Sequence, residues 1–331
     1  MNRKVDEPVL VYAEQSIACG SKSFAAASRL FDAQTRRAAV MLYAWCRHCD
    51  DVIDGQVSGH DATPLSAAQA GQRLAHLRKQ TCAVYTDADP EEPAFQALRQ
   101  VANDHGIPAD EALDLLQGFE MDVEGQRYET LDDTLQYCYH VAGVVGLMMG
   151  RVMGVRDVAT LDHACDLGLG MQLTNIARDI IEDAQVGRCY LPNDWLRVAG
   201  IPPGELAEHE HRAALGLLAG RLVEHAEPYY ASAEVGLAAL PWRSAWAVAT
   251  AASVYRQIGL KVQQAGQHAW DGRISTSKPE KLAAVVAGLW RSLTRRWRSR
   301  PARSPTLWQR PDPSCAEARH AAPATASAGG R

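Results

Sequence analysis

The sequence predicts an all-α fold. Apolar residues recur with a helical period through most of the 331 residues, and alanine and leucine are abundant. We find no series of alternating strands bounded by hairpin turn residues. With 47% hydrophobic residues, the chain can bury a large core as one big domain or two.

Composition limits the classes of function. A net charge of -5 gives no electrostatic basis for nucleic acid as the main partner. The eight cysteines are scattered without a disulfide framework, which fits a reducing cytosol. Residues 1–10 contain no apolar run of signal-peptide length, and no window approaches the roughly 20 apolar residues of a membrane span. We therefore expect a cytoplasmic protein that is soluble or peripheral to a membrane.

Glycine and proline mark the expected ends of helices along the chain. From residue 298 onward, five prolines interrupt the sequence, which ends in alanine, serine and glycine. This composition predicts a mostly disordered tail over residues 298–331. The expected helix breaks are Gly20, residues 55–64, residues 87–93, residues 106–108, Gly187, residues 200–204, Pro241 and the region of Gly272.

The first acidic cluster lies in the helical segment that ends at Asp54. Asp50 and Asp54 are four residues apart, so their carboxylates lie on one face of a helix, about one turn apart. Tyr43 and Arg47 fall on the same stripe, and the opposite side of the helix is apolar. Asp51 points away from this stripe, which makes it a lesser candidate.

The second acidic cluster repeats this arrangement far downstream. Asp179 and Asp183 are again four residues apart, and Gln172 and Asn175 share their stripe. A single such pair is usually a solvated face with salt bridges. Two pairs, each in a polar stripe, favour a cage of oxygen ligands for Mg2+ bound to the phosphates of a substrate.

A glycine-rich segment predicts a close helix contact and an apolar face. Glycines destabilise helices, so a stripe of them indicates a neighbouring helix that approaches closely. The other face either walls a hydrocarbon tunnel or packs in the core. The glycines are Gly143, Gly146 and Gly150, and the other face consists of Tyr137, Val141, Val144 and Met148.

A metal cage with cations beside it and an apolar cavity beneath it suits an apolar diphosphate whose diphosphate group departs. Apolar walls would keep water from the allylic carbocation that is left. The chain resembles the squalene and phytoene synthases, most closely the bacterial phytoene synthases. The resemblance covers about residues 21–282, through motifs at residues 21–24, 43–54, 137–146, 172–179 and 187–192.

This resemblance implies an isoprenoid-synthase fold, in which one helical domain over residues 1–297 surrounds a central cavity. It also implies a reaction: two geranylgeranyl diphosphates join head to head through prephytoene diphosphate to give phytoene. The cofactor would be Mg2+, with Mn2+ as an alternative, and neither NADPH nor ATP would be needed. Neighbouring enzymes of carotenoid synthesis are potential partners.

The resemblance also implies roles for individual residues. The metal ligands would be Asp50, Asp54, Asn175, Asp179 and Asp183. Tyr137, Tyr43, Arg47 and Arg178 would lie at the reacting centre, where the Tyr137 ring could stabilise a cation and its hydroxyl could help remove a proton. The substrate diphosphate would contact Ser21, Lys22, Arg47, Gln172, Arg178, Tyr255 and Arg256.

Two other functions stay open from the sequence. Dehydrosqualene or squalene synthesis from farnesyl diphosphate would use the same site, with NADPH for the squalene product. A non-catalytic scaffold that binds lipid or other proteins is the second alternative, and the retained acidic set argues against it.

The segment Trp290 to Arg300 also has two interpretations. Trp290, Leu293 and Trp297 recur at helical spacing among several arginines. Such a helix either lies on the anionic inner face of the cell membrane or packs its tryptophans on the core.

Overall fold

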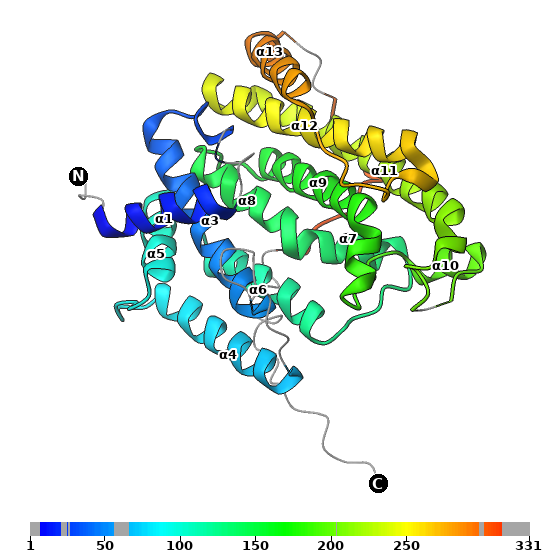
Figure 1. The fold of residues 1–331 in the computed structure, drawn as a ribbon. Coiled ribbons are helices and arrows are strands. Elements are labelled where there is room, and N and C mark those ends of the chain that lie inside the picture. Colours follow the sequence, from blue (N-terminus) through cyan, green and yellow to red (C-terminus); the bar gives the residue numbers. More distant parts are fainter. Residues whose placement is uncertain are drawn as a thin grey trace.

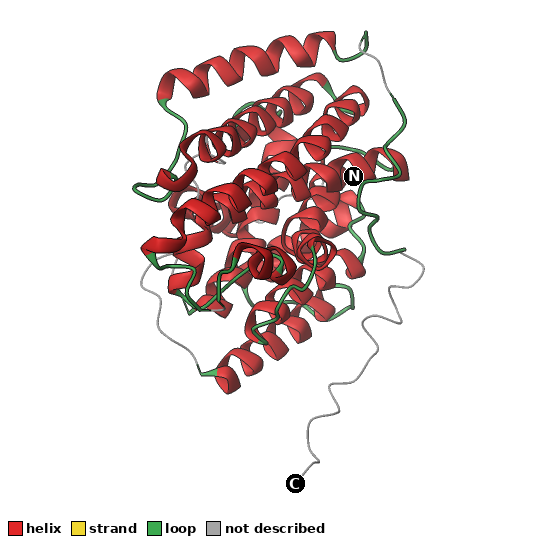
Figure 2. Cartoon of the chain, turned by 90° about the vertical axis from the view of Figure 1, so that its right-hand side faces the viewer, coloured by secondary structure: helices red, strands yellow, loops and turns green. Residues whose placement is uncertain are grey.

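The computed structural model describes residues 7–20, 25, 27–55, 66–202, 204–297 and 301–312. Within these ranges all regular secondary structure is helical, so the predicted fold class is confirmed (Figure 2). The α-helices are α1 (Glu7–Gly20), α3 (Ala33–Asp54), α4 (Ala67–Val84), α5 (Pro93–His105), α6 (Ala109–Val123), α7 (Leu131–Cys138), α8 (Val144–Val152), α9 (Val158–Gln185), α10 (Asn193–Ala199), α11 (Arg212–Gly236), α12 (Trp242–Ala265) and α13 (Lys278–Thr294). Shorter helical elements are the π-helix η1 (Tyr139–Gly143) and the 3-10 turns η2 (His209–His211), η3 (Leu237–Ala239) and η4 (Gly266–His268).

The helices form two groups, and each group carries one acidic cluster. In the N-terminal group, α3 packs on α1 and α5, while α4 packs on α6. In the C-terminal group, α9 packs on α11 and α8, α12 packs on α11, and α13 covers α12 as the outermost helix (Figure 1). The two aspartate-bearing helices, α3 and α9, therefore come from different groups.

The local sequence defines the ends of both aspartate-bearing helices. Asp32 caps α3 by accepting hydrogen bonds at 3.0 Å from the amides of Gln34 and Thr35. Asp157 caps α9 in the same way, through the amide of Thr160 at 2.8 Å. The apolar back of α3 is buried, with Trp45 fully inaccessible to solvent, so the acidic stripe faces away from the core.

Most helix ends occur at the predicted breaks. Helix α3 stops at Gly55, whose φ of 65° lies in the left-handed region that glycine adopts at low cost. Two of the breaks that the sequence analysis missed lie at Gly125, between α6 and α7, and at Gly154, between α8 and α9, where φ is 62° and 92°. The second was missed because Gly154 is a single glycine next to apolar residues that continue the helical period.

The predicted glycine contact is confirmed between α8 and α9. A Cβ added to Gly146 would lie 2.2 Å from the carbonyl oxygen of Ala164. A Cβ added to Gly168 would lie 2.3 Å from the carbonyl oxygen of Ala142. Only glycine permits this approach, and it brings the backbone of α8 against the helix that carries the second acidic cluster.

The structure differs from the expected disordered tail over residues 301–312. Arg303 donates through Nε and Nη2 to the buried carboxylate of Asp166, each at 2.8 Å, and Arg310 reaches Asp162 at 2.6 Å. Leu307 is only 6% exposed. A buried carboxylate needs a cationic partner, and this pairing outweighs the effect of the prolines. The rest of the predicted tail lies outside the described residues.

In the part of the chain that the structure describes, no helix combines the length and the apolar character needed to cross a membrane.

Candidate active site

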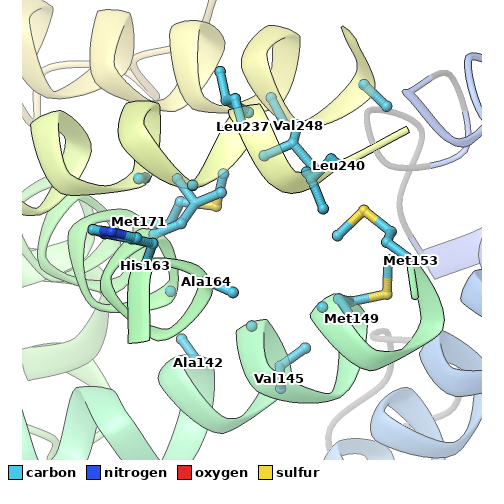
Figure 3. Close-up of a pocket in the computed structure, with 18 of the residues that line it drawn as sticks. Ala142, Val145, Met149, Met153, His163, Ala164, Met171, Leu237, Leu240 and Val248 are labelled. Carbon is cyan, nitrogen blue, oxygen red and sulfur yellow. The ribbon is translucent and has the colours of Figure 1, made fainter. Parts of the chain in front are cut away.

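An apolar cavity of about 380 Å³ runs along α9. Val145 and Met149 point into it from α8, and Leu240 and Val248 point into it from the opposite side (Figure 3). Cavity-lining residues of α9 extend from Thr160 to Asn175. The cavity therefore ends one helical turn before Asp179, where the second acidic cluster begins.

The cavity-lining face of residues 137–150 differs from the predicted one. Val144 and Met148 are buried in the core, whereas Val141, Val145 and Met149 line the cavity. The π-helix η1 inserts an extra residue per turn, so the positions after it are shifted relative to an uninterrupted α-helix. Of the predicted face, only Val141 was placed correctly on the cavity.

The first acidic cluster is held by Arg47. Its guanidinium lies 2.9 Å from Asp50 and 2.7 Å from Asp51. Asp51 therefore shares the cation with Asp50 although it lies off the predicted stripe. The Tyr43 hydroxyl lies against the last residue of α1. A Cβ added to Gly20 would be 2.5 Å from it.

Two predicted phosphate contacts follow Gly20 directly in the chain. Ser21 and Lys22 lie outside the described residues, so their expected role stays a prediction.

The second acidic cluster has two cations beside it. The Arg178 guanidinium donates to both carboxylate oxygens of Asp179, through Nε at 2.7 Å and through Nη2. Arg273 approaches the same carboxylate at 3.9 Å. Arg273 lies on the loop between α12 and α13, outside any periodic pattern, and the sequence analysis missed it for that reason.

Arg188 connects the two clusters. It follows α9 by three residues, and its Nη2 lies 2.6 Å from Oδ1 of Asp54 on α3. Its positive charge also opposes the rise in the pKa of both Asp50 and Asp183. Arg188 thus lies within electrostatic range of carboxylates from both helices.

The crowded carboxylates have raised pKa values. Burial, followed by the charge of Asp54, raises the pKa of Asp50 to about 6. Burial, followed by the charge of Asp179, raises the pKa of Asp183 to about 7. Carboxylates that repel one another in a partly desolvated place are suited to binding an added cation.

Asn175 supports this interpretation independently. Its amide nitrogen donates to Oε1 of Gln172 at 3.3 Å, while its Oδ1 is buried without a hydrogen-bond partner. A buried carbonyl oxygen without a partner is costly unless something else binds it. Asp179 and Asp183 follow Asn175 on the same helix face, and these oxygens are the ligand types that a hard divalent cation such as Mg2+ prefers.

A different acidic group does not belong to this site. Among the described residues, Glu205, Glu210 and His211 bring three ligand atoms within 4.8 Å of one another. Both glutamates are exposed, and the group lies at η2. None of the predicted metal ligands is part of it.

Tyr137 is buried beside the clusters, and it does not line the apolar cavity. Its hydroxyl donates to Oδ2 of Asp122 at 3.1 Å. Its ring stacks on Tyr190, with centroids 4.5 Å apart and planes at 19°. Burial, followed by the nearby charge of Asp122, raises the pKa of Tyr137 well above its ordinary value.

Tyr255 and Arg256 point in different directions. Tyr255 lines the cavity together with Gln172 and Asn175. Arg256 lies in a separate groove, where it binds Glu227 at 2.8–2.9 Å. Successive residues of a helix are about 100° apart, so both side chains cannot face the cavity. The structure therefore brings Tyr255 to the site and leaves Arg256 away from it.

The fold and the site together define an all-α protein of the isoprenoid-synthase class, with an apolar cavity that ends beside the second of two carboxylate clusters. The family model described as squalene/phytoene synthase matches residues 17–280. The chain belongs to the squalene/phytoene synthase family.

Relatives of known name support this assignment. The chain is 57% identical to a 15-cis-phytoene synthase of Pantoea ananas, over 92% of this chain and 98% of the relative. It is 60% identical to a 15-cis-phytoene synthase of Enterobacter agglomerans, over 88% of this chain and 99% of the relative. The crystal structure of a dehydrosqualene synthase in complex with ligand is similar at a TM-score of 0.76 and 28% identity, covering 85% of this chain and 95% of that one.

Proposed function

We propose that the protein is a phytoene synthase, which joins two geranylgeranyl diphosphates head to head through prephytoene diphosphate and releases diphosphate twice. The observation that carries this proposal is the apolar cavity along α9 that ends one turn before the second carboxylate cluster, with Arg188 from the loop after α9 paired to Asp54 of the first cluster. The names of the relatives that are 57% and 60% identical support the choice of phytoene as product.

The proposed metal ligands are the four outer aspartates and one amide: Asp50, Asp54, Asp179, Asp183 and Asn175. When bound there, Mg2+ or Mn2+ would neutralise the charge that develops on the departing diphosphate. The raised pKa values of Asp50 and Asp183 support a need for such a cation.

The arginines of this chain would bind the diphosphate oxygens. Arg47 and Arg178 are the sequence candidates, and Arg188 and Arg273 join them because both lie within 4 Å of a cluster carboxylate. Guanidinium groups suit this task since they present several donors in a fixed plane. Gln172 and Tyr255 lie where the cavity approaches the clusters and would orient the reacting end of the substrate.

The remaining part of the cavity would exclude water. Its walls are mostly valine, leucine, methionine and alanine side chains, which would keep water from an allylic carbocation. Tyr43 and Tyr137 flank the clusters and would contribute ring faces beside the cation. The Tyr137 hydroxyl donates to Asp122, which fixes the orientation of its ring.

Synthesis of dehydrosqualene from farnesyl diphosphate is the second candidate, favoured by the structural similarity to a dehydrosqualene synthase. A shorter chain would leave part of the cavity unfilled. The phytoene reaction is redox-neutral, so NADPH would have no effect on it.

The C-terminal end of helix α13 and the turn after it would bring the enzyme to the inner face of the cell membrane. Trp290 is 66% exposed, Leu293 55% and Trp297 85%, so they do not pack on the core. Residues 281–311 contain eight lysines and arginines and no acidic residue, although the whole chain is acidic. Exposed tryptophan beside arginine suits an anionic lipid surface. Contact with other enzymes of carotenoid synthesis stays a prediction.

Release of diphosphate from geranylgeranyl diphosphate tests the proposal. We expect release that requires Mg2+ and stops when a chelator is added. A folded protein that releases no diphosphate would contradict the enzymatic function and favour the scaffold alternative.

A further inference from the structure

Asp122 accepts two phenol hydrogen bonds beside the carboxylate clusters. It lies at the C-terminal end of α6, where Oδ2 accepts from Tyr137 at 3.1 Å and Oδ1 accepts from Tyr190 at 2.9 Å. Each carboxylate oxygen thus has its own donor. The pair of bonds links α6, α7 and the loop after α9 through one side chain.

The loop residue Tyr190 is fixed from several sides. Its ring stacks on Tyr137 and lies 5.9 Å from the ring of Tyr128. Its carbonyl oxygen accepts a hydrogen bond at 2.9 Å from the hydroxyl of Thr134 on α7. Tyr190 is only 7% exposed, so little freedom is left to this part of the loop.

Arg188 stands two residues before Tyr190 in the same loop. Its backbone amide donates to the carbonyl oxygen of Asp183 at 2.9 Å, and its guanidinium reaches Asp54. The guanidinium is therefore placed between the two acidic helices by a loop whose other anchor is Tyr190.

The negative charge of Asp122 is unfavourable because the carboxylate is buried and lies near another acidic residue. Burial raises the pKa of Asp122, and the charge of Asp54 raises it further. A neutral side chain would remove this repulsion. The two phenol hydrogen bonds and the charge of Arg188 offset it.

From this geometry we propose that Asp122 is a positioning residue: through Tyr190 it holds Arg188 between the two acidic clusters, ready to bind the substrate diphosphate. The proposal rests on the proposed function, because it gives Arg188 a phosphate to bind. In this proposal Asp122 acts through Tyr190 and Arg188, and both of its carboxylate oxygens are already taken by phenol hydrogen bonds.

Binding of inorganic diphosphate in the presence of Mg2+ tests the proposal without requiring turnover. In calorimetric titrations we expect Asp122→Leu, which removes both acceptors, to raise the Kd about tenfold. Asp122→Asn keeps one acceptor and should have a smaller effect in the same direction. If the Leu variant does not fold, the Asn variant and Tyr190→Phe carry the test.

The same helix offers a matched control. Asp114 is a buried carboxylate of α6 that accepts a phenol hydrogen bond from Tyr139 at 2.6 Å, away from the acidic clusters. Asp114→Leu should lower the melting temperature and leave the Kd for diphosphate unchanged. This variant separates a loss of stability from a loss of positioning.

A double variant decides whether Asp122 acts through Arg188. In an Arg188→Ala background, adding Asp122→Asn should raise the Kd by less than about twofold, because the group to be positioned is already gone. An unchanged Kd in a folded Asp122→Leu protein, or fully additive effects in the double variant, would overturn the proposal.

The binding test of Asp122 can succeed or fail independently of the test of the proposed function. Failure of the wild-type protein to make phytoene would contradict the proposed function, while Asp122-dependent binding of diphosphate would still support the positioning role.

Discussion

Arg188 and Asp54 form an ion pair at 2.6 Å between residues that are 134 positions apart in the chain. This pair connects the loop after α9 to the last turn of α3 and adds an ion pair to the packing of α6 on α8 between the two helix groups. Since the Arg188 side chain is one-third exposed, the pair should contribute little to stability and more to the electrostatics of the site.

Replacement of Arg188 by alanine should therefore affect diphosphate binding more than folding. We expect KM for geranylgeranyl diphosphate to rise about tenfold, as for loss of a charge-assisted hydrogen bond, with unfolding free energy reduced by about 1 kcal/mol or less. Steady-state kinetics and urea denaturation measure the two effects. Arg197→Ala is the control, because Arg197 forms an exposed pair with Glu129 away from the site, and it should change neither value.

Loss of one aspartate charge should abolish turnover without unfolding the protein. Asp50→Asn and Asp179→Asn each remove a proposed ligand charge with little change in volume, so kcat should fall by at least about a hundredfold. Circular dichroism should show unchanged helix content. Glu182→Gln is the matched control on α9, since Glu182 is exposed and points off the stripe. Wild-type activity of either Asn variant at saturating Mg2+ would show that the residue is not a ligand.

The stability of the metal-free protein should fall as pH rises from about 4 to about 7. The pKa values of Asp50 and Asp183 are raised to about 6 and about 7, so the folded state holds more protons in this window than the unfolded state does. Mg2+ binds the deprotonated carboxylates, so its stabilising effect should grow over the same range.

Melting temperatures between pH 5 and pH 8, with and without Mg2+, measure both trends. In Asp183→Asn, the part of the pH dependence near pH 7 should disappear. A stabilisation by Mg2+ that does not change with pH would contradict the assignment of these two carboxylates to the metal.

The shifted cavity face can be tested with adjacent residues. Val145 lines the cavity and Val144 is buried in the core, although an uninterrupted helix would favour Val144 for the cavity. Val145→Phe should reduce kcat/KM for the twenty-carbon diphosphate about tenfold more than for the fifteen-carbon one, because it shortens the space for the chain. Val144→Ala should cost about 1–3 kcal/mol of stability and leave this ratio unchanged. If Val144→Ala changed this ratio and Val145→Phe did not, the cavity face predicted from the sequence would be correct.

Helix α13 should bind anionic vesicles. We expect the double variant Trp290→Ser/Trp297→Ser to lose most of its flotation with vesicles that contain phosphatidylglycerol. Leu217→Ser is the control, since Leu217 on α11 is 77% exposed without belonging to α13. No flotation of the wild-type protein would contradict the membrane proposal.

Local sequence patterns predicted the helices and both acidic stripes well. These features depend on residues within one or two turns, so periodicity and capping residues determine them. The π-helix at Tyr139–Gly143 could not be foreseen, because its register depends on close packing between α8 and α9.

The parts of the site that were missed depend on contacts between distant segments. Arg273 reaches the second cluster only after loops and helices from separate regions have packed. Arg256 was assigned together with its neighbour Tyr255, and the helix directs the two side chains to different places. The docking of residues 301–312 likewise depends on Asp166, a buried carboxylate whose need for a cation is not visible in the local sequence.

Analysis of the hydrocarbon product most directly tests the proposed function. The purified protein is incubated with Mg2+ and either the fifteen- or the twenty-carbon diphosphate, with and without NADPH, and the extracted hydrocarbons are separated. Our account predicts phytoene from the twenty-carbon substrate in equal yield with and without NADPH, and much less product from the fifteen-carbon substrate. Squalene or dehydrosqualene as the preferred product, or a requirement for NADPH, would contradict it.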